Sequence, residues 1–109
     1  MTLIIKDQYE IKSPYIPDEN QNHPRGIIRT KYYPNGQLAV YYQDTNGEPI
    51  AELSINEDSI QLDSDEIILK NYSENAKIAK DFLDSEILLP TERFIIIGSH
   101  LCPICKVCV

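Results

Sequence analysis

Residues 27–56, IIRTKYYPNGQLAVYYQDTNGEPIAELSIN, are the stretch that decides the fold. Two Asn-Gly pairs, at 35–36 and 46–47, separate three segments rich in Ile, Val, Tyr and Thr. Asn-Gly supplies the positive φ angles that tight hairpin turns require. In the middle segment Leu38, Val40 and Tyr42 fall on one face of the expected strand, which we expect to be buried. The stretch therefore predicts a three-stranded antiparallel meander.

Residues 71–84 predict the one main helix. Its apolar residues recur at helical spacing and form a stripe that we expect to lie on the sheet; they are Ala76, Ile78, Ala79, Phe82 and Leu83. Asn71 and Glu74 have the spacing of a capping box, and Ser73 is an alternative cap. Lys80 and Asp84 are spaced for an exposed ion pair.

The remaining segments predict further strands and one long loop. Residues 3–12 indicate an edge strand and residues 67–69 a short strand, while the apolar run 94–97 is typical of a buried strand. Residues 13–26 contain three prolines and predict a loop, and the Cys-rich residues 98–109 predict a terminal strand at a sheet edge, because Pro103 interrupts it. We therefore expect a single small α+β domain over residues 1–109, with the meander and two or three further strands packed against the helix.

Composition narrows the class of protein. The chain has 109 residues, with 17 acidic and 10 basic side chains and a net charge of -7, which disfavours direct binding to nucleic acid. It shows neither a cleavable signal pattern nor a membrane-spanning apolar segment. The odd number of cysteines favours reduced thiols and a cytoplasmic location. Neither a phosphate-binding glycine loop nor a nucleophile elbow is present, so we expect a protein that is not an enzyme.

The C-terminal residues His100, Cys102, Cys105 and Cys108 are the one candidate metal site. Four soft or borderline ligands match the needs of tetrahedral zinc. An alternative is a redox pair of Cys102 and Cys105. We favour a third interpretation, in which the cysteines are small buried residues of a strand and the protein has no cofactor.

Charge is distributed unevenly along the chain. Residues 32–69 contain no Lys or Arg but eight acids: Asp44, Glu48, Glu52, Glu57, Asp58, Asp63, Asp65 and Glu66. We expect these to form one negative patch that attracts a partner protein with a basic surface, the alternative being a solubilising surface. Tyr33 and Tyr41, on the first hairpin, are candidate contact residues for the same partner, or else pack as cross-strand pairs.

Three segments carry a resemblance to a known family: NGQLAV at 35–40, GEPIAELSIN at 47–56 and LKNYSEN at 69–75. The chain resembles, over about residues 27–97, a family of small domains from phages, conjugative plasmids and other mobile elements of gut and related bacteria, for which no activity is established. The resemblance implies a shared fold. The Cys-rich tail departs from the family pattern, so the resemblance does not imply a metal site.

Small acidic proteins of mobile elements often inhibit host defence systems, as anti-CRISPR and anti-restriction proteins do. The resemblance thus implies a protein-binding module that inhibits a nucleic-acid-handling defence enzyme of the host through its acidic surface. We expect no contact with nucleic acid or membrane, and a monomer or homodimer. The alternatives are a zinc-binding or redox protein that uses the His/Cys cluster, and a homodimeric accessory structural protein.

Overall fold

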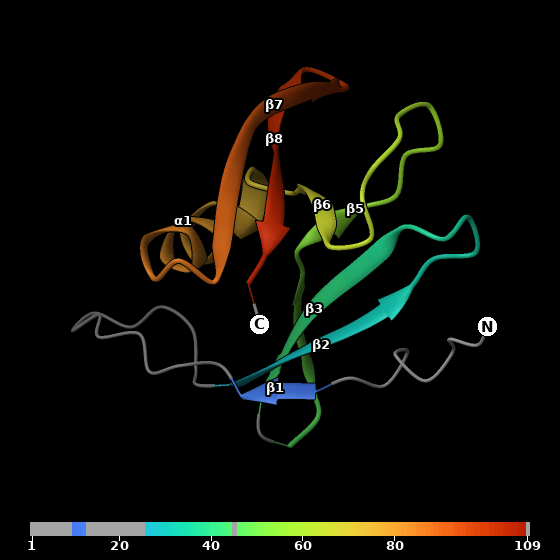
Figure 1. Cartoon of the computed structure of the whole chain (residues 1–109). Coiled ribbons are helices and arrows are strands. Elements are labelled where there is room, and N and C mark those ends of the chain that lie inside the picture. Colours follow the sequence, from blue (N-terminus) through green and yellow to red (C-terminus); the bar gives the residue numbers. More distant parts are fainter. Residues whose placement is uncertain (1–9, 13–25, 45, 109) are drawn as a thin grey trace.

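Two antiparallel sheets and one helix make up the part of the chain that the structure describes (Figure 1). The computed structural model describes residues 10–12, 26–44 and 46–108. The first sheet has the order β1-β2-β3-β4, with β1 at Glu10–Lys12, β2 at Gly26–Tyr32, β3 at Leu38–Asp44 and β4 at Pro49–Glu52. The second has the order β5-β6-β8-β7, with β5 at Ser54–Ile55, β6 at Glu66–Leu69, β7 at Leu88–Ile97 and β8 at His100–Val107. The 3-10 turn η2 (Ser73–Asn75) leads into helix α1 (Ala76–Asp84).

The predicted α+β class and the meander β2-β3-β4 are confirmed. The Asn-Gly turns differ in detail from the prediction. Gly36 has a φ of 91° and Gly47 a φ of 89°, whereas neither Asn35 nor Asn46 has a positive φ. In the first turn the Gly36 N–H donates to the Tyr33 carbonyl at 2.8 Å, and the Asn35 side chain accepts from the Gln37 N–H. Each turn thus needs only its glycine in the left-handed region, as in a type I turn followed by a glycine bulge.

The chain passes from the first sheet to the second at Leu53, which the prediction of one meander over 27–56 did not anticipate. The Leu53 N–H donates to the Val40 carbonyl at 2.8 Å, and the Leu53 carbonyl accepts from the Lys70 N–H at 2.8 Å. The next residue, Ser54, accepts from the Val40 N–H through its hydroxyl at 2.9 Å. One residue is therefore bonded to both sheets, and Ile55 pairs with β6 rather than continuing β4.

The main core lies where the two sheets and α1 meet. Tyr42 of β3 and Phe82 of α1 pack edge to face, with ring centroids 5.2 Å apart. The other fully buried members come from all three elements, and include Ile28, Val40, Leu53, Ile67, Leu69 and Cys105. The expected burial of Leu38, Val40 and Tyr42 is confirmed. Ile78, Ala79 and Phe82 are the buried part of the predicted helical stripe.

The helix begins later than predicted. Neither η2 nor α1 has a side-chain cap, so the proposed capping box of Asn71 and Glu74 is wrong. Ser73 has a φ of 56°, which breaks the helical path. The buried Asn75 side chain donates to the Glu52 carbonyl at 2.7 Å, so it makes a tertiary bond instead of capping its own helix. The predicted ion pair of Lys80 and Asp84 is present at 2.8 Å.

The helix ends in a Schellman motif that carries a glutamate where glycine is usual. The Glu86 N–H donates to the Leu83 carbonyl and the Ile87 N–H to the Phe82 carbonyl, and Glu86 has a φ of 65°. A side chain in this region costs about 1 kcal/mol relative to glycine. We expect Glu86→Gly to raise the free energy of unfolding by about 0.5–1 kcal/mol in urea titrations. Glu86→Ala removes the charge but keeps the strain, so an equal gain from it would contradict this account.

The two C-terminal strands exchange the positions predicted for them. β8 lies between β6 and β7, so the Cys-rich segment is not at a sheet edge, whereas β7 is at the edge of the second sheet. The prediction that 94–97 is buried is wrong, because Phe94 is 54% and Ile96 67% exposed. Pro103 is tolerated inside the sheet because β6 pairs with β8 only as far as Ile68↔Ile104, so the proline falls beyond that ladder.

Some predictions lie outside the described residues: the strand before Glu10 and the loop 13–25. Residues 10–12 form a strand at the edge of the first sheet, paired with β2. Within the described part of the chain, no helix has the length and apolar character needed to cross a membrane.

Candidate functional site

The end of the β7–β8 hairpin exposes a group of large apolar side chains. Gly98, with a φ of 63°, and Ser99 form its two-residue turn, which extends beyond α1 (Figure 1). Paired residues of an antiparallel ladder share a face, and Ile96 pairs with Leu101. Phe94, Ile96 and Leu101 therefore lie on one outer face, exposed by 54%, 67% and 58%. We call these three side chains the apolar arm.

The inner face of the same hairpin is covered. Ile95 and Ile97 pack against a second buried cluster formed by Ile68, Cys102 and Ile104. Ile60 and Leu62 pack against the same cluster from the segment between β5 and β6, residues 56–65, which we call the acidic loop. The hairpin is thus supported on one side, while its outer face carries the apolar arm.

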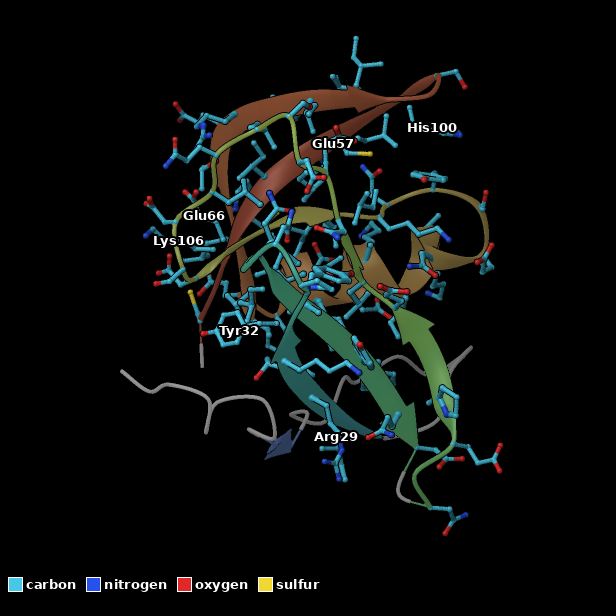
Figure 2. The ribbon with its side chains drawn as sticks, turned by 90° about the vertical axis from the view of Figure 1, so that its right-hand side faces the viewer. Arg29, Tyr32, Glu57, Glu66, His100 and Lys106 are labelled. Carbon is cyan, nitrogen blue, oxygen red and sulfur yellow. The ribbon has the colours of Figure 1, made fainter. Side chains whose placement is uncertain are left out.

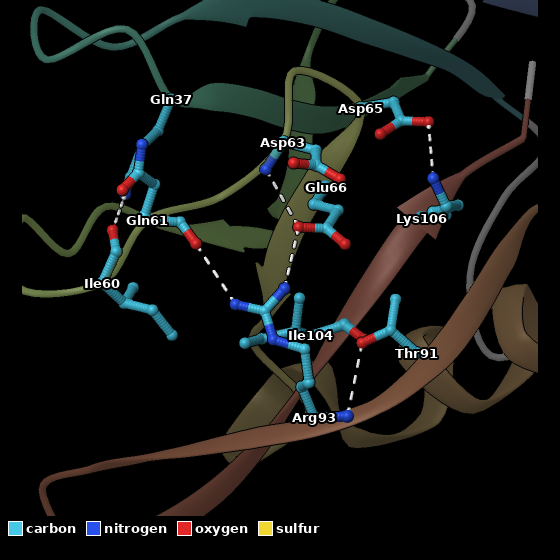
Figure 3. Close-up of polar contacts among 10 residues, drawn as sticks. All are labelled: Gln37, Ile60, Gln61, Asp63, Asp65, Glu66, Thr91, Arg93, Ile104 and Lys106. Carbon is cyan, nitrogen blue, oxygen red and sulfur yellow. Dashed lines mark hydrogen bonds and ion pairs between the residues drawn. The ribbon is translucent and has the colours of Figure 1, made fainter.

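A buried carboxylate fixes the acidic loop to the hairpin (Figure 3). The Glu66 side chain is 5% exposed, and its Oε1 accepts from Arg93 Nη1 at 3.2 Å and from the Asp63 N–H at 2.9 Å. Arg93 Nη2 donates to the Gln61 carbonyl at 3.2 Å, so one guanidinium ties β7 both to β6 and to the loop.

Gln37 anchors the other end of the loop. Its side-chain amide donates to the Glu57 carbonyl at 2.8 Å and the Ile60 carbonyl at 3.1 Å, and accepts from the Glu57 N–H at 3.0 Å. Asn35 donates to Asp58. The turn between β2 and β3 therefore holds the loop through backbone groups, and an open depression of about 450 Å³ lies between them.

The eight predicted carboxylates do not form one patch, so that expectation is corrected. Asp65 and Glu66 are ion-paired, each at 3.2 Å, with Lys106 and Arg93. Asp44 and Glu48 lie at the β3–β4 turn, at the opposite end of the molecule from Glu57 (Figures 1 and 2). The separation arises because the acidic loop folds over the second sheet while the β3–β4 turn belongs to the first. Asp63 lies within the electrostatic reach of Lys106, whose main partner is Asp65. Within the described structure Glu57 and Asp58 of the loop are hydrogen-bonded to Ser59 and Asn35 and to no cation.

The tyrosines of the first hairpin also lie in different environments. Tyr42 is in the core, and Tyr33 donates to Glu52 and shares a 2.8 Å hydrogen bond with the Ser54 hydroxyl. Burial, together with the Glu52 contact, raises the pKa of the Tyr33 phenol. Tyr41 lies under Lys31, whose Nζ is 5.1 Å from the ring centroid. Tyr33 and Tyr41 therefore make intramolecular contacts, and their predicted role with a partner stays a prediction.

The predicted zinc ligands are spread along strand β8. His100 stacks on Tyr72 with centroids 3.8 Å apart, Cys102 and Cys105 are buried in different clusters, and Cys108 is exposed. A strand rises about 3.3 Å per residue, which places His100 and Cys108 about 26 Å apart, whereas zinc holds its ligands at about 2 Å. In the described residues no three potential metal ligands lie together. The fold does not bring this quartet to one point.

Burial raises the pKa of the Cys105 thiol to about 11 and also raises the pKa of Cys102. Both shifts oppose the thiolate that redox chemistry needs.

The raised pKa of Cys105 makes stability depend on pH. The thiol of the unfolded chain loses its proton near pH 8.5, about the ordinary thiol pKa, so between that pH and about 11 the folded state holds a proton that the unfolded state has lost. We expect the free energy of unfolding to be unaffected below that pH, and to fall as pH rises toward 11. Cys105→Val should flatten this decline in urea titrations at pH 8, 9 and 10; an unchanged decline would contradict the assignment.

Comparison of the chain with models of protein families, with curated proteins and with solved structures found no match. The resemblance to a mobile-element family therefore stays a prediction.

The apolar arm and Arg93 are the residues that sequence reasoning missed. The signal was present in Gly98-Ser99, because glycine at the first central position is typical of a type II′ hairpin turn. That turn joins the apolar run 94–97 to the Cys-rich segment and would have indicated a hairpin.

Proposed function

We propose that this chain is a protein-binding module without enzymatic activity, which binds a protein partner with a basic surface. The observation that carries the proposal is the apolar arm beside the acidic loop. Three large apolar side chains, each more than half exposed, share one face of a hairpin whose other face packs under the loop. Contiguous exposed apolar groups rimmed by polar residues are typical of protein-binding surfaces.

Electrostatics supports a basic partner. The second sheet contains only two cationic side chains, Arg93 and Lys106, and both are ion-paired within the chain. Glu57, Asp58 and Asp63 of the loop and Glu92 of β7 thus place part of the molecule's net charge of -7 beside the apolar arm. Such a surface steers a cationic partner toward it, and the apolar arm then supplies the buried centre of the contact.

The partner class that we propose is a nucleic-acid-handling defence enzyme of the host. Enzymes of this kind have basic grooves that bind the phosphate backbone, and carboxylates can occupy such a groove in its place. The resemblance to mobile-element domains supports the same class. The contact would be with the enzyme and not with its nucleic acid, because a net charge of -7 repels phosphates.

The test compares two triple variants of equal charge change. The loop variant replaces Glu57, Asp58 and Asp63 with Lys. The control replaces Glu48, Asp84 and Glu86 with Lys; these three side chains are exposed and lie outside the acidic loop and the hairpin. Tagged proteins are used for capture from a lysate of the source organism, with quantitative mass spectrometry. We expect the wild type and the control to capture a nuclease or another nucleic-acid-binding enzyme. The loop variant should capture at least about tenfold less of it, and the purified wild-type protein should inhibit its activity. Equal capture by the loop variant, or captured enzymes whose activity is unchanged, would overturn the proposal.

A further inference from the structure

Strand β7 is an edge strand that is protected along only half of its length. Within the described residues it pairs with β8 on one side and with no strand on the other. Free edges offer unpaired N–H and C=O groups to other chains, and natural proteins block them with proline, bulges and charges.

The first half of β7 has all three of these devices. Pro90 lacks an N–H, and the register with β8 shifts between Pro90 and Arg93, so that Thr91 and Glu92 bulge out. Glu92 has a φ of 73° and is charged, and the Thr91 hydroxyl donates to the Ile104 carbonyl at 2.8 Å. A second strand cannot continue along this half.

The second half, residues 93–97, has no proline and no bulge, and its one charged side chain, Arg93, is directed to Glu66 and the Gln61 carbonyl. This half pairs with β8 in regular register from Arg93↔Ile104 to Ile97↔His100, and its last four residues are apolar. Two of them, Phe94 and Ile96, belong to the apolar arm. The open edge and two of the three side chains of the apolar arm therefore lie within the same five residues.

We infer that residues 93–97 of β7 accept an extended segment of the partner as an additional strand of the second sheet. Main-chain hydrogen bonds to the free edge would hold the segment, and its apolar side chains would pack beside Phe94, Ile96 and Leu101. Lysine or arginine residues that flank the segment would lie near the carboxylates of the acidic loop and of Glu92. This inference rests on the proposed function and specifies how the partner binds.

Charge complementarity selects a cationic segment over a second copy of this chain. A second β7 strand would bring its own acidic loop and Glu92, and a second net charge of -7, to the same place. Like charges brought together in this way oppose pairing. A segment with basic flanks meets no such repulsion.

The test uses three synthetic peptides titrated into the ¹⁵N-labelled full chain: Lys-Lys-Thr-Val-Thr-Val-Thr-Lys-Lys, the same peptide with Glu in place of each Lys, and the Lys peptide N-methylated at all three Thr and both Val residues. We expect the first peptide to shift the amide signals of residues 93–97. The Glu peptide should bind about tenfold or more weakly because of charge, and the N-methylated peptide likewise because it lacks the strand N–H donors. Equal binding of the N-methylated peptide, or no shifts at 93–97 with any peptide, would overturn the inference.

A pair of protein variants localises the contact. Phe94→Ser with Ile96→Ser should weaken binding of the Lys peptide about tenfold. Leu89→Ser changes an apolar residue, 40% exposed, in the protected half of β7 and should leave binding unchanged. Equal losses in both variants would contradict strand addition at 93–97.

The outcomes separate the inference from the proposed function. If reversal of the loop charges abolishes partner capture while the Phe94/Ile96 double variant retains it, the protein-binding function stands and strand addition fails. If neither the loop variant nor the Phe94/Ile96 double variant changes capture, both proposals fail. Light scattering at several concentrations detects pairing of two copies of this chain. If it shows a dimer that the Phe94/Ile96 double variant disrupts, the strand added to β7 is that of a second copy and not that of a partner protein, and the inference fails.

Discussion

Replacement of Phe82 with alanine should lower the free energy of unfolding by about 3–5 kcal/mol, the largest effect that we expect from a single substitution. Phe82 has no exposed surface, and its ring packs against Tyr42 across the junction of the helix and the first sheet. The α1 helix has nine residues and no side-chain cap, and a helix this short is not stable without tertiary contacts. Loss of the ring therefore removes both core packing and the main attachment of the helix.

Urea titrations followed by far-UV circular dichroism and tyrosine fluorescence measure this effect, since the chain has no tryptophan. Leu83→Ala is the matched control, because Leu83 is the next residue of α1 and only packs against the rim of the core. It should cost about 1 kcal/mol. Similar losses from the two variants would mean that Phe82 is not the residue that attaches the helix.

Replacement of Arg93 with methionine should cost about 2 kcal/mol. Removal of one partner from a fully buried ion pair costs about 3–5 kcal/mol, and we take a lower value because the Arg93 side chain is 48% exposed. The loss arises because Glu66, which is 5% exposed, would keep its charge without its ion-pair partner and with only the more distant Lys106 nearby. The Gln61 carbonyl would lose its guanidinium donor as well.

A double variant distinguishes the stranded charge from lost packing. Glu66→Gln in the Arg93→Met background removes the charge and keeps an oxygen that accepts from the Asp63 N–H. We expect it to restore more than half of the lost stability in urea titrations. If the double variant is less stable than Arg93→Met alone, the buried charge is not the cause.

The local elements were predictable because short-range chemistry specifies them. Each Asn-Gly pair places glycine where a hairpin needs a positive φ, and alternation identified the buried face of β3. The stripe that includes Ile78 and Phe82 identified the face of α1 that packs on the sheets. The boundaries were less predictable, because the Asn75 side chain forms a hydrogen bond with residue Glu52, which is distant in sequence.

The candidate site was less accessible from the sequence. The acidic residues of 44–66 are close in sequence, yet the β3–β4 turn and the acidic loop lie at opposite ends of the molecule (Figure 2). The partners of Asp65 and Glu66 are Lys106 and Arg93, which come from strands far along the chain. Charge along a sequence therefore did not predict charge on a surface.

The sequence by itself determined the meander turns, the apolar faces of β3 and α1, and the α+β class, because these depend on residues a few positions apart. Only the tertiary structure decided which strands share a sheet. Residues 66–68 pair with 104–106, and this long-range pairing places β8 inside the second sheet and leaves β7 at its edge. The end of the β7–β8 hairpin extends beyond α1 (Figure 1), so the apolar run 94–97 exposes Phe94 and Ile96 there, just as the inner strand β8 exposes Leu101.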